Sequence, residues 1–152
     1  MTDPYPTDRA YVRDELARLD CRLRIEVDRF DGPIDEFGAL YVSEAEVKEL
    51  LSREATDGAG QMDHDEHQRF THYTQEIRER RRETAESGEP LRIDSLLARF
   101  DLADLAREVL LIAMAPDLDE KYATVYAYLQ DDATRRRPTV GFVLGLLGPA
   151  AD

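Results

Sequence analysis

The chain has 152 residues, and its 33 acidic and 20 basic side chains give it a net charge of −13 at neutral pH. This length suits one domain or two small lobes, and a hydrophobic content of 42% is sufficient for a packed core. No apolar stretch approaches the roughly 18 residues of a membrane span, and the first residues are acidic and polar, so we expect neither a membrane helix nor a signal peptide. The single cysteine, Cys21, excludes an internal disulfide, and the acidic charge argues against non-specific binding of nucleic acid. We expect a cytoplasmic protein.

The acidic composition is of a particular kind. Lysine occurs only at Lys48 and Lys121, and the 18 aspartates outnumber the 15 glutamates. Molar salt shortens the screening length to about 3 Å, which makes a crowded carboxylate surface tolerable. We therefore interpret the chain as a halophilic, haloarchaeal protein, and an ordinary acidic protein is the alternative.

Helical periodicity dominates the first half of the chain. Ser43 and Glu46 have the spacing of a capping box, which predicts a second helix after the first. Residues 55–65 are predicted to form a mobile loop, and a third helix is predicted from about Glu66 to Glu86. Residues 78–83 at its end are charged on every side, so we expect them to project into solvent. The first helix, capped by Thr7 or Asp8, has one apolar stripe: Val12, Leu16, Leu19, Leu23, Val27 and Phe30.

The second half follows a break at residues 87–90 and is more apolar. We predict a short helix near residues 93–100 and a strongly apolar, central helix that begins at Asp104 and ends at Pro116. Two amphipathic helices follow, with the apolar sets Tyr122, Val125, Tyr126 and Leu129, and Val140, Val143, Leu144 and Leu147. Without a convincing hairpin or βαβ pattern, the sequence predicts an all-α helical bundle in two lobes, residues 1–88 and 91–148.

Three histidines, His64, His67 and His72, are the only candidates for a metal site. Imidazole is a suitable ligand for zinc or nickel. However, the cluster lies where a loop joins a helix, and His67 and His72 fall on different faces of that helix. We therefore favour an adventitious or structural role for the histidines and assign no metal. The sequence contains no catalytic motif and no phosphate-binding loop, so we assign no catalytic residue and no cofactor.

Two groups of arginines stand out in so acidic a chain. Arg78, Arg80, Arg81 and Arg82 end the third helix beside glutamates, which is typical of a solvated, salt-bridged helix end. Arg135, Arg136 and Arg137 lie instead in a short linker between apolar helices. Because guanidinium groups suit carboxylates and phosphates, these three are either a latch to acidic neighbours or a partner-binding surface.

The same linker carries a family resemblance. Residues 128–132 read Tyr-Leu-Gln-Asp-Asp and residues 134–140 read Thr-Arg-Arg-Arg-Pro-Thr-Val. Together with residues 91–102 and 108–122, and with weaker segments near residues 19–27 and 37–44, they resemble the N-terminal domain of AAA+ ATPases found alongside contractile injection systems. The resemblance implies a helical region, winged-helix-like after about residue 90, ahead of an ATPase module that would bind ATP and Mg²⁺.

Two functions follow as hypotheses. The first is a non-catalytic binding or regulatory domain that recruits a protein partner or sets the assembly of ATPase subunits, as the front end of a longer polypeptide that oligomerises through its ATPase. The alternative is a DNA-binding winged-helix regulator, for which only Arg135, Arg136 and Arg137 supply a basic face in the second lobe. A metal-dependent enzyme built on the three histidines ranks last.

The charge predicts a salt-dependent stability. Carboxylate repulsion destabilises the folded state in dilute buffer, while molar salt screens it and strengthens apolar burial. We expect the melting temperature to rise markedly between about 0.1 M and 2 M KCl, with the third helix loosening before the apolar helix 105–114. A melting temperature that stays flat across this series would contradict the halophilic interpretation.

Overall fold

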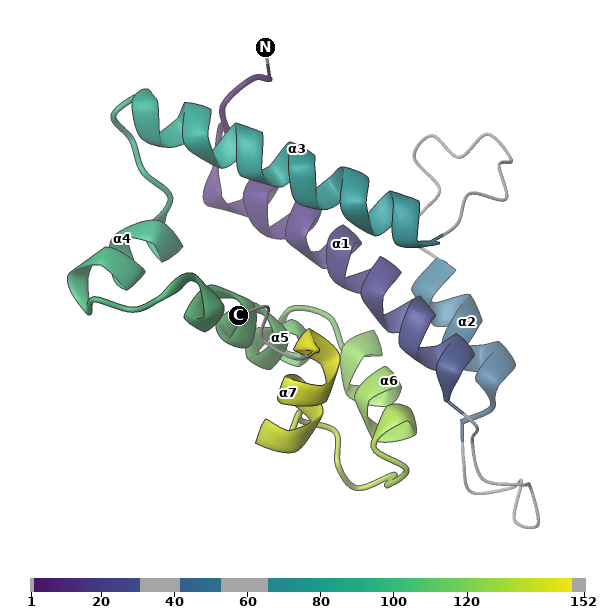
Figure 1. The fold of residues 1–152 in the computed structure, drawn as a ribbon. Helices are drawn as coiled ribbons and strands as arrows, with labels where there is room; N and C mark the ends of the chain where they lie inside the picture. The colour runs from purple at the N-terminus through teal and green to yellow at the C-terminus, as the bar shows by residue number, and fades with distance from the viewer. Residues whose placement is uncertain (1, 31–41, 53–65, 149–152) are drawn as a thin grey trace.

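The computed structural model describes residues 2–30, 42–52 and 66–148, and within these ranges the chain forms helices and no strand (Figure 1). The all-α prediction is therefore confirmed for this part of the chain. The predicted loop 55–65 lies outside the described residues. The helices are α1 (Asp8–Arg29), α2 (Glu44–Ser52), α3 (Glu66–Glu86), α4 (Arg92–Arg99), α5 (Asp104–Leu118), α6 (Lys121–Leu129) and α7 (Val140–Leu147).

The first helix, α1, is the central element. The Thr7 hydroxyl caps it by accepting a hydrogen bond from the Ala10 N–H at 3.1 Å, which leaves Asp8 inside the first turn. Helix α3 lies along one side of α1, and α2, α5 and α6 contact it elsewhere (Figure 1). Because α1 is covered from several directions, it buries more than the single apolar stripe that its sequence predicts.

The capping box of α2 forms as predicted. The Ser43 N–H donates to the Glu46 carboxylate at 2.8 Å, and the Glu46 N–H donates to the Ser43 hydroxyl at 3.2 Å. The helix then buries Val47 and Leu51 completely. The local sequence signal thus predicts the start of this helix correctly.

Two apolar clusters form the interior. The larger one joins α1 and α2 to α5, α6 and α7, so it draws on residues from both predicted lobes. The division into lobes at 1–88 and 91–148 stays a prediction. The larger cluster contains Leu19, Leu23, Val27, Val47, Leu51, Ile112, Ala115, Tyr122, Val125, Tyr126, Val143 and Leu146, and the smaller one contains Tyr5, Tyr11, Ile77 and Leu91.

The charged end of α3 projects into solvent only in part: Arg78 and Arg82 are exposed, as predicted, but the side with Arg80 and Arg81 is covered. Arg80 forms an ion pair with Asp14 of α1 at 2.8 Å, and the hydroxyl of the buried Thr84 accepts a hydrogen bond from the Tyr5 N–H at 2.8 Å. Arg80 also lies over the Tyr5 ring, 4.0 Å from its centroid. The N-terminal segment and α1 thus cover this end of α3 through polar and aromatic contacts, which hydrophobic periodicity does not detect.

Helix α5 does not end at Pro116 but continues to Leu118. Proline lacks the N–H that would normally bond to the carbonyl oxygen four residues earlier, here that of Ile112. The hydroxyl of the buried Tyr126 donates to this oxygen at 2.9 Å and replaces the missing bond. The helix is also less enclosed than predicted, since Leu105 and Met114 are exposed.

A buried ion pair joins α1 to α6. The Lys121 ammonium lies 2.9 Å from the Asp20 carboxylate, and both side chains are about 95% enclosed, with exposures of 6% and 5%. The Tyr122 hydroxyl donates to the other oxygen of Asp20 at 2.7 Å. Burial raises the pKa of Asp20, while the Lys121 ammonium and the Tyr122 hydroxyl favour its ionised form.

The two lysines of the chain provide a matched test of this pair. Lys121→Met leaves the Asp20 carboxylate buried without its cation, so we expect the free energy of unfolding to fall by about 3–5 kcal/mol in urea titrations. Lys48→Met should change it little, because Lys48 is exposed where it contacts Asp28 and Glu44. The double variant Asp20→Asn/Lys121→Met should recover part of the loss. Equal stabilities of the Lys48 and Lys121 variants would contradict this role.

Candidate interaction surface

The linker between α6 and α7, residues 130–139, is organised by the side chain of Gln130. Its carboxamide nitrogen donates to the carbonyl oxygens of Arg135 and Arg137, each at 3.1 Å. Its carboxamide oxygen accepts from the N–H and the hydroxyl of Thr139, at 3.1 and 3.0 Å. One side chain thus ties both the middle and the end of the linker to the last turn of α6. The sequence analysis did not single out Gln130, because a lone glutamine after a helix carries no pattern.

Each of the three linker arginines contacts a carboxylate. Arg137 forms a bidentate pair with Asp117 of α5, with distances of 2.8 and 3.0 Å, and this contact holds the pKa of Asp117 below its usual value. Arg136 lies 3.1 Å from Glu120, and Arg135 lies 3.0 Å from Asp132.

These contacts correspond to the predicted latch. Two of the three pairs fold the linker back onto the corner between α5 and α6. All three arginine side chains are nevertheless more than half exposed, at 59%, 54% and 68% from Arg135 to Arg137. They therefore stay accessible to a partner, and their role in partner binding stays a prediction.

Exposed apolar side chains lie close to the linker in the sequence. Leu118 follows Asp117, the carboxylate that holds Arg137, and Val140 begins α7 and is 76% exposed. Met114 of α5 and Leu144 of α7 are exposed as well. Of the predicted apolar stripe of α7, Val143 is buried, but Val140 and Leu144 are exposed, and the helix buries Leu146, which the stripe did not include. Arginine and methionine are among the residue types enriched in protein interfaces.

The predicted histidine cluster forms no metal site in the part of the chain that can be described. His67 and His72 are both exposed on α3, where His72 is 3.6 Å from Glu76, and His64 lies outside the described residues. Within residues 2–30, 42–52 and 66–148, no three potential ligands come together to hold an ion.

The single thiol is buried in α1. Cys21 is 1% exposed, and this burial raises its pKa to about 11. A thiol with such a pKa is protonated at neutral pH, so its chemistry is that of a packed side chain rather than of a nucleophile.

Removal of the Gln130 carboxamide should loosen the linker. We expect Gln130→Ala to lower the free energy of unfolding by about 1 kcal/mol and to accelerate tryptic cleavage after Arg135 and Arg136 in the folded protein. Gln75→Ala is the matched control, since the exposed Gln75 forms a hydrogen bond with Glu79 within α3 only. Unchanged cleavage rates in Gln130→Ala would show that the ion pairs alone hold the linker.

No helix among the described residues has both the length and the apolar character needed to cross a bilayer. A family model described as a winged helix domain, variant, matches residues 1–152. No curated protein and no solved structure gives a significant match. The sequence resemblance implied a winged-helix-like region only after about residue 90, whereas the family model covers both halves of the chain. With its all-helical described part, the chain belongs to the family of variant winged helix domains.

Proposed function

We propose that this chain is a non-catalytic module that binds another protein through the surface formed by the linker 130–139 and its apolar neighbours. The observation that carries the proposal is the combination of exposed arginines with exposed large apolar side chains, Leu118 and Val140 among them. Covering exposed apolar side chains with another protein is favourable, because it removes their surface from water. Phosphate groups offer no such gain.

Binding to DNA is the second candidate, because winged helix domains serve both purposes. Its support is the positive charge of Arg135, Arg136 and Arg137. Against it stand the net charge of −13 and the carboxylate beside each of these arginines, which a phosphate would have to displace. The electrostatic balance therefore favours a protein partner.

The finer proposal follows the resemblance of the linker to AAA+ ATPases that accompany contractile injection systems. In it, the chain is the N-terminal domain of such an ATPase in the cytoplasm of a halophile, and Arg135, Arg136 and Arg137 contact the partner or a neighbouring subunit. ATP and Mg²⁺ would bind in a downstream module only. A phosphate-loop sequence encoded beyond residue 152 would support this proposal, while a stop codon or nucleotide binding by residues 1–152 would contradict it.

Fluorescence anisotropy separates the two candidates. We titrate a labelled DNA duplex of about 20 base pairs with the chain at about 0.15 M salt, and we expect no saturable binding up to about 100 μM protein, where non-specific DNA-binding domains saturate. The matched variant carries Arg135→Gln, Arg136→Gln and Arg137→Gln. Saturable binding that this triple variant abolishes would establish the DNA-binding alternative.

The protein-binding arm uses the full-length protein. If the gene encodes a downstream ATPase, the same triple variant should weaken subunit assembly or partner recruitment, measured by light scattering, while the ATPase activity per assembled subunit stays constant. Wild-type assembly in the variant would remove the linker arginines from the proposed interface.

A further inference from the structure

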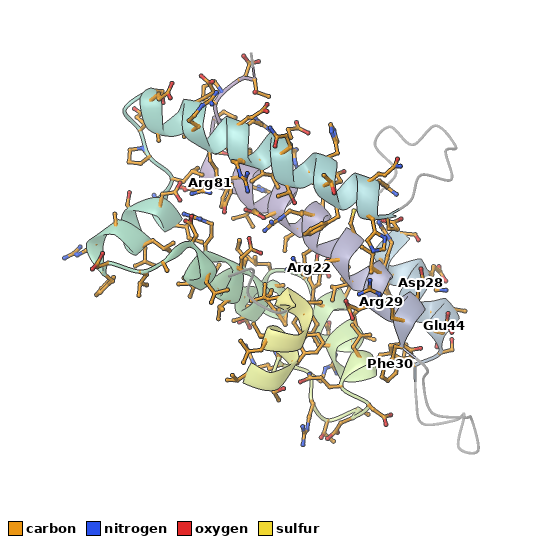
Figure 2. The ribbon with its side chains drawn as sticks, in the orientation of Figure 1. Arg22, Asp28, Arg29, Phe30, Glu44 and Arg81 are labelled. Carbon is orange, nitrogen blue, oxygen red and sulfur yellow. The ribbon has the colours of Figure 1, made fainter. Side chains whose placement is uncertain are left out.

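A narrow cavity lies where α1, α3 and α5 meet, and charged side chains form half of its lining. Figure 2 shows Arg22 on α1, on the side of that helix that faces α5. About 20 Å³ of the cavity is open to the centres of water molecules. Since one water molecule needs about 10–15 Å³, the space suits a ligand of about that size. The lining consists of Glu15, Arg18, Leu19, Arg22, Phe70, Glu108, Leu111 and Ile112.

One carboxylate oxygen in this lining accepts no hydrogen bond. The Glu15 side chain is 3% exposed, and its Oε1 accepts a hydrogen bond from the Tyr11 hydroxyl at 2.8 Å. Its Oε2 lies 2.7 Å from an Nη of Arg18, which balances its charge, yet this oxygen is buried without any hydrogen-bond donor. Such an oxygen is rare in folded proteins, because its desolvation is not fully compensated. Since Tyr11 does not line the cavity, Oε2 is the oxygen of Glu15 that remains for a ligand there.

The guanidinium group of Arg22 makes no hydrogen bond to any described residue. It lies over the Phe70 ring, 4.7 Å from the centroid, and its Nη1 is 3.8 Å from Oε2 of Glu108. This distance exceeds that of a direct hydrogen bond, so the Arg22 N–H groups and this oxygen can each bond to a third group. Burial lowers the pKa of Arg22 and raises that of Glu15, which indicates that both ions are poorly solvated.

The charges of the lining balance. Glu15 and Glu108 supply two negative charges, Arg18 and Arg22 supply two positive charges, and among the described residues these four form ion pairs only with one another. A cation in the cavity would be repelled by two guanidinium groups, and an anion by two carboxylates. The groups that remain for a ligand are carboxylate oxygens and guanidinium N–H groups. They require a small neutral molecule that both donates and accepts hydrogen bonds.

We infer that an ordered water molecule binds in this cavity and joins α1 to α5. It accepts a hydrogen bond from the Arg22 guanidinium and donates one to Oε2 of Glu15 and one to Oε2 of Glu108. Three hydrogen bonds are typical of a buried water molecule. The site lies apart from the linker 130–139, so this inference is independent of the proposed function.

Water–methyl NOE and ROE spectra of the methyl-labelled chain test this site. A water molecule that stays bound longer than the protein takes to tumble gives NOE and ROE cross-peaks of opposite sign. We expect such peaks at the methyl groups of Leu19 and Leu111, which line the cavity. We expect none at Val125, which is fully buried and does not line it. Absence of the peaks at both leucines would overturn the inference.

The side chain of Arg22 is tested by substitution. Arg22→Met removes the donor and retains an unbranched side chain, so we expect the water peaks at Leu19 and Leu111 to be lost. Arg13→Met is the matched control, because Arg13 lies on the same helix with a 76% exposed side chain, and it should leave the peaks in place. The methyl spectra also show whether each variant keeps its fold. Unchanged peaks in a folded Arg22→Met variant would overturn the assigned role of Arg22.

A crystal structure of the unmodified chain grown in RbCl is the second measurement. We expect density within about 3.2 Å of Oε2 of Glu15 and of the Arg22 guanidinium, without an anomalous signal from rubidium. Absent density would overturn the site. An anomalous peak in the cavity would overturn the assignment to water, because it would show that a monovalent cation binds there.

Discussion

The buried contact between Lys121 and Asp20 is the interaction on which the arrangement of the helices depends. It fixes the start of α6 against the middle of α1, in the same region where the larger apolar cluster is assembled. A charged pair inside the protein stabilises only when both partners and their hydrogen bonds are complete, and here the Tyr122 hydroxyl completes the set. Helix α1 also contacts α2 and α3. Loss of the Lys121–Asp20 contact would therefore alter how α6 packs against the helix that supports α2 and α3.

Arginines connect the helices elsewhere, so positive charge in this acidic chain is used largely for internal contacts. Arg18 of α1 pairs with Glu108 of α5 at 2.6 Å, and Arg24 donates to the carbonyl oxygen of Leu51, near the end of α2. The planar guanidinium group can bridge two helices while part of it is desolvated, which the compact, strongly hydrated ammonium does less well. In the linker, by contrast, three consecutive guanidinium groups remain more than half exposed together.

Local signals were sufficient to predict much of the fold. The capping box at Ser43 and the predicted bounds of α3 agree with the structure, since both depend on residues adjacent in the chain. The continuation of α5 past Pro116 was not predictable, because the compensating hydroxyl comes from another helix. The candidate interaction surface was likewise predictable only in part. A run of arginines is visible in the sequence, but the contacts of Gln130 are visible only after folding.

The hydrogen bond from Tyr126 to the Ile112 carbonyl also determines the order in which residues can be exchanged. With proline at position 116, a phenylalanine at position 126 would leave that buried oxygen without a donor. With alanine at position 116, the helix itself supplies an N–H, and phenylalanine at position 126 becomes tolerable. Replacement of Tyr126 by phenylalanine is therefore costly while Pro116 is present and tolerable once it has been exchanged, so the order that preserves stability replaces the proline first.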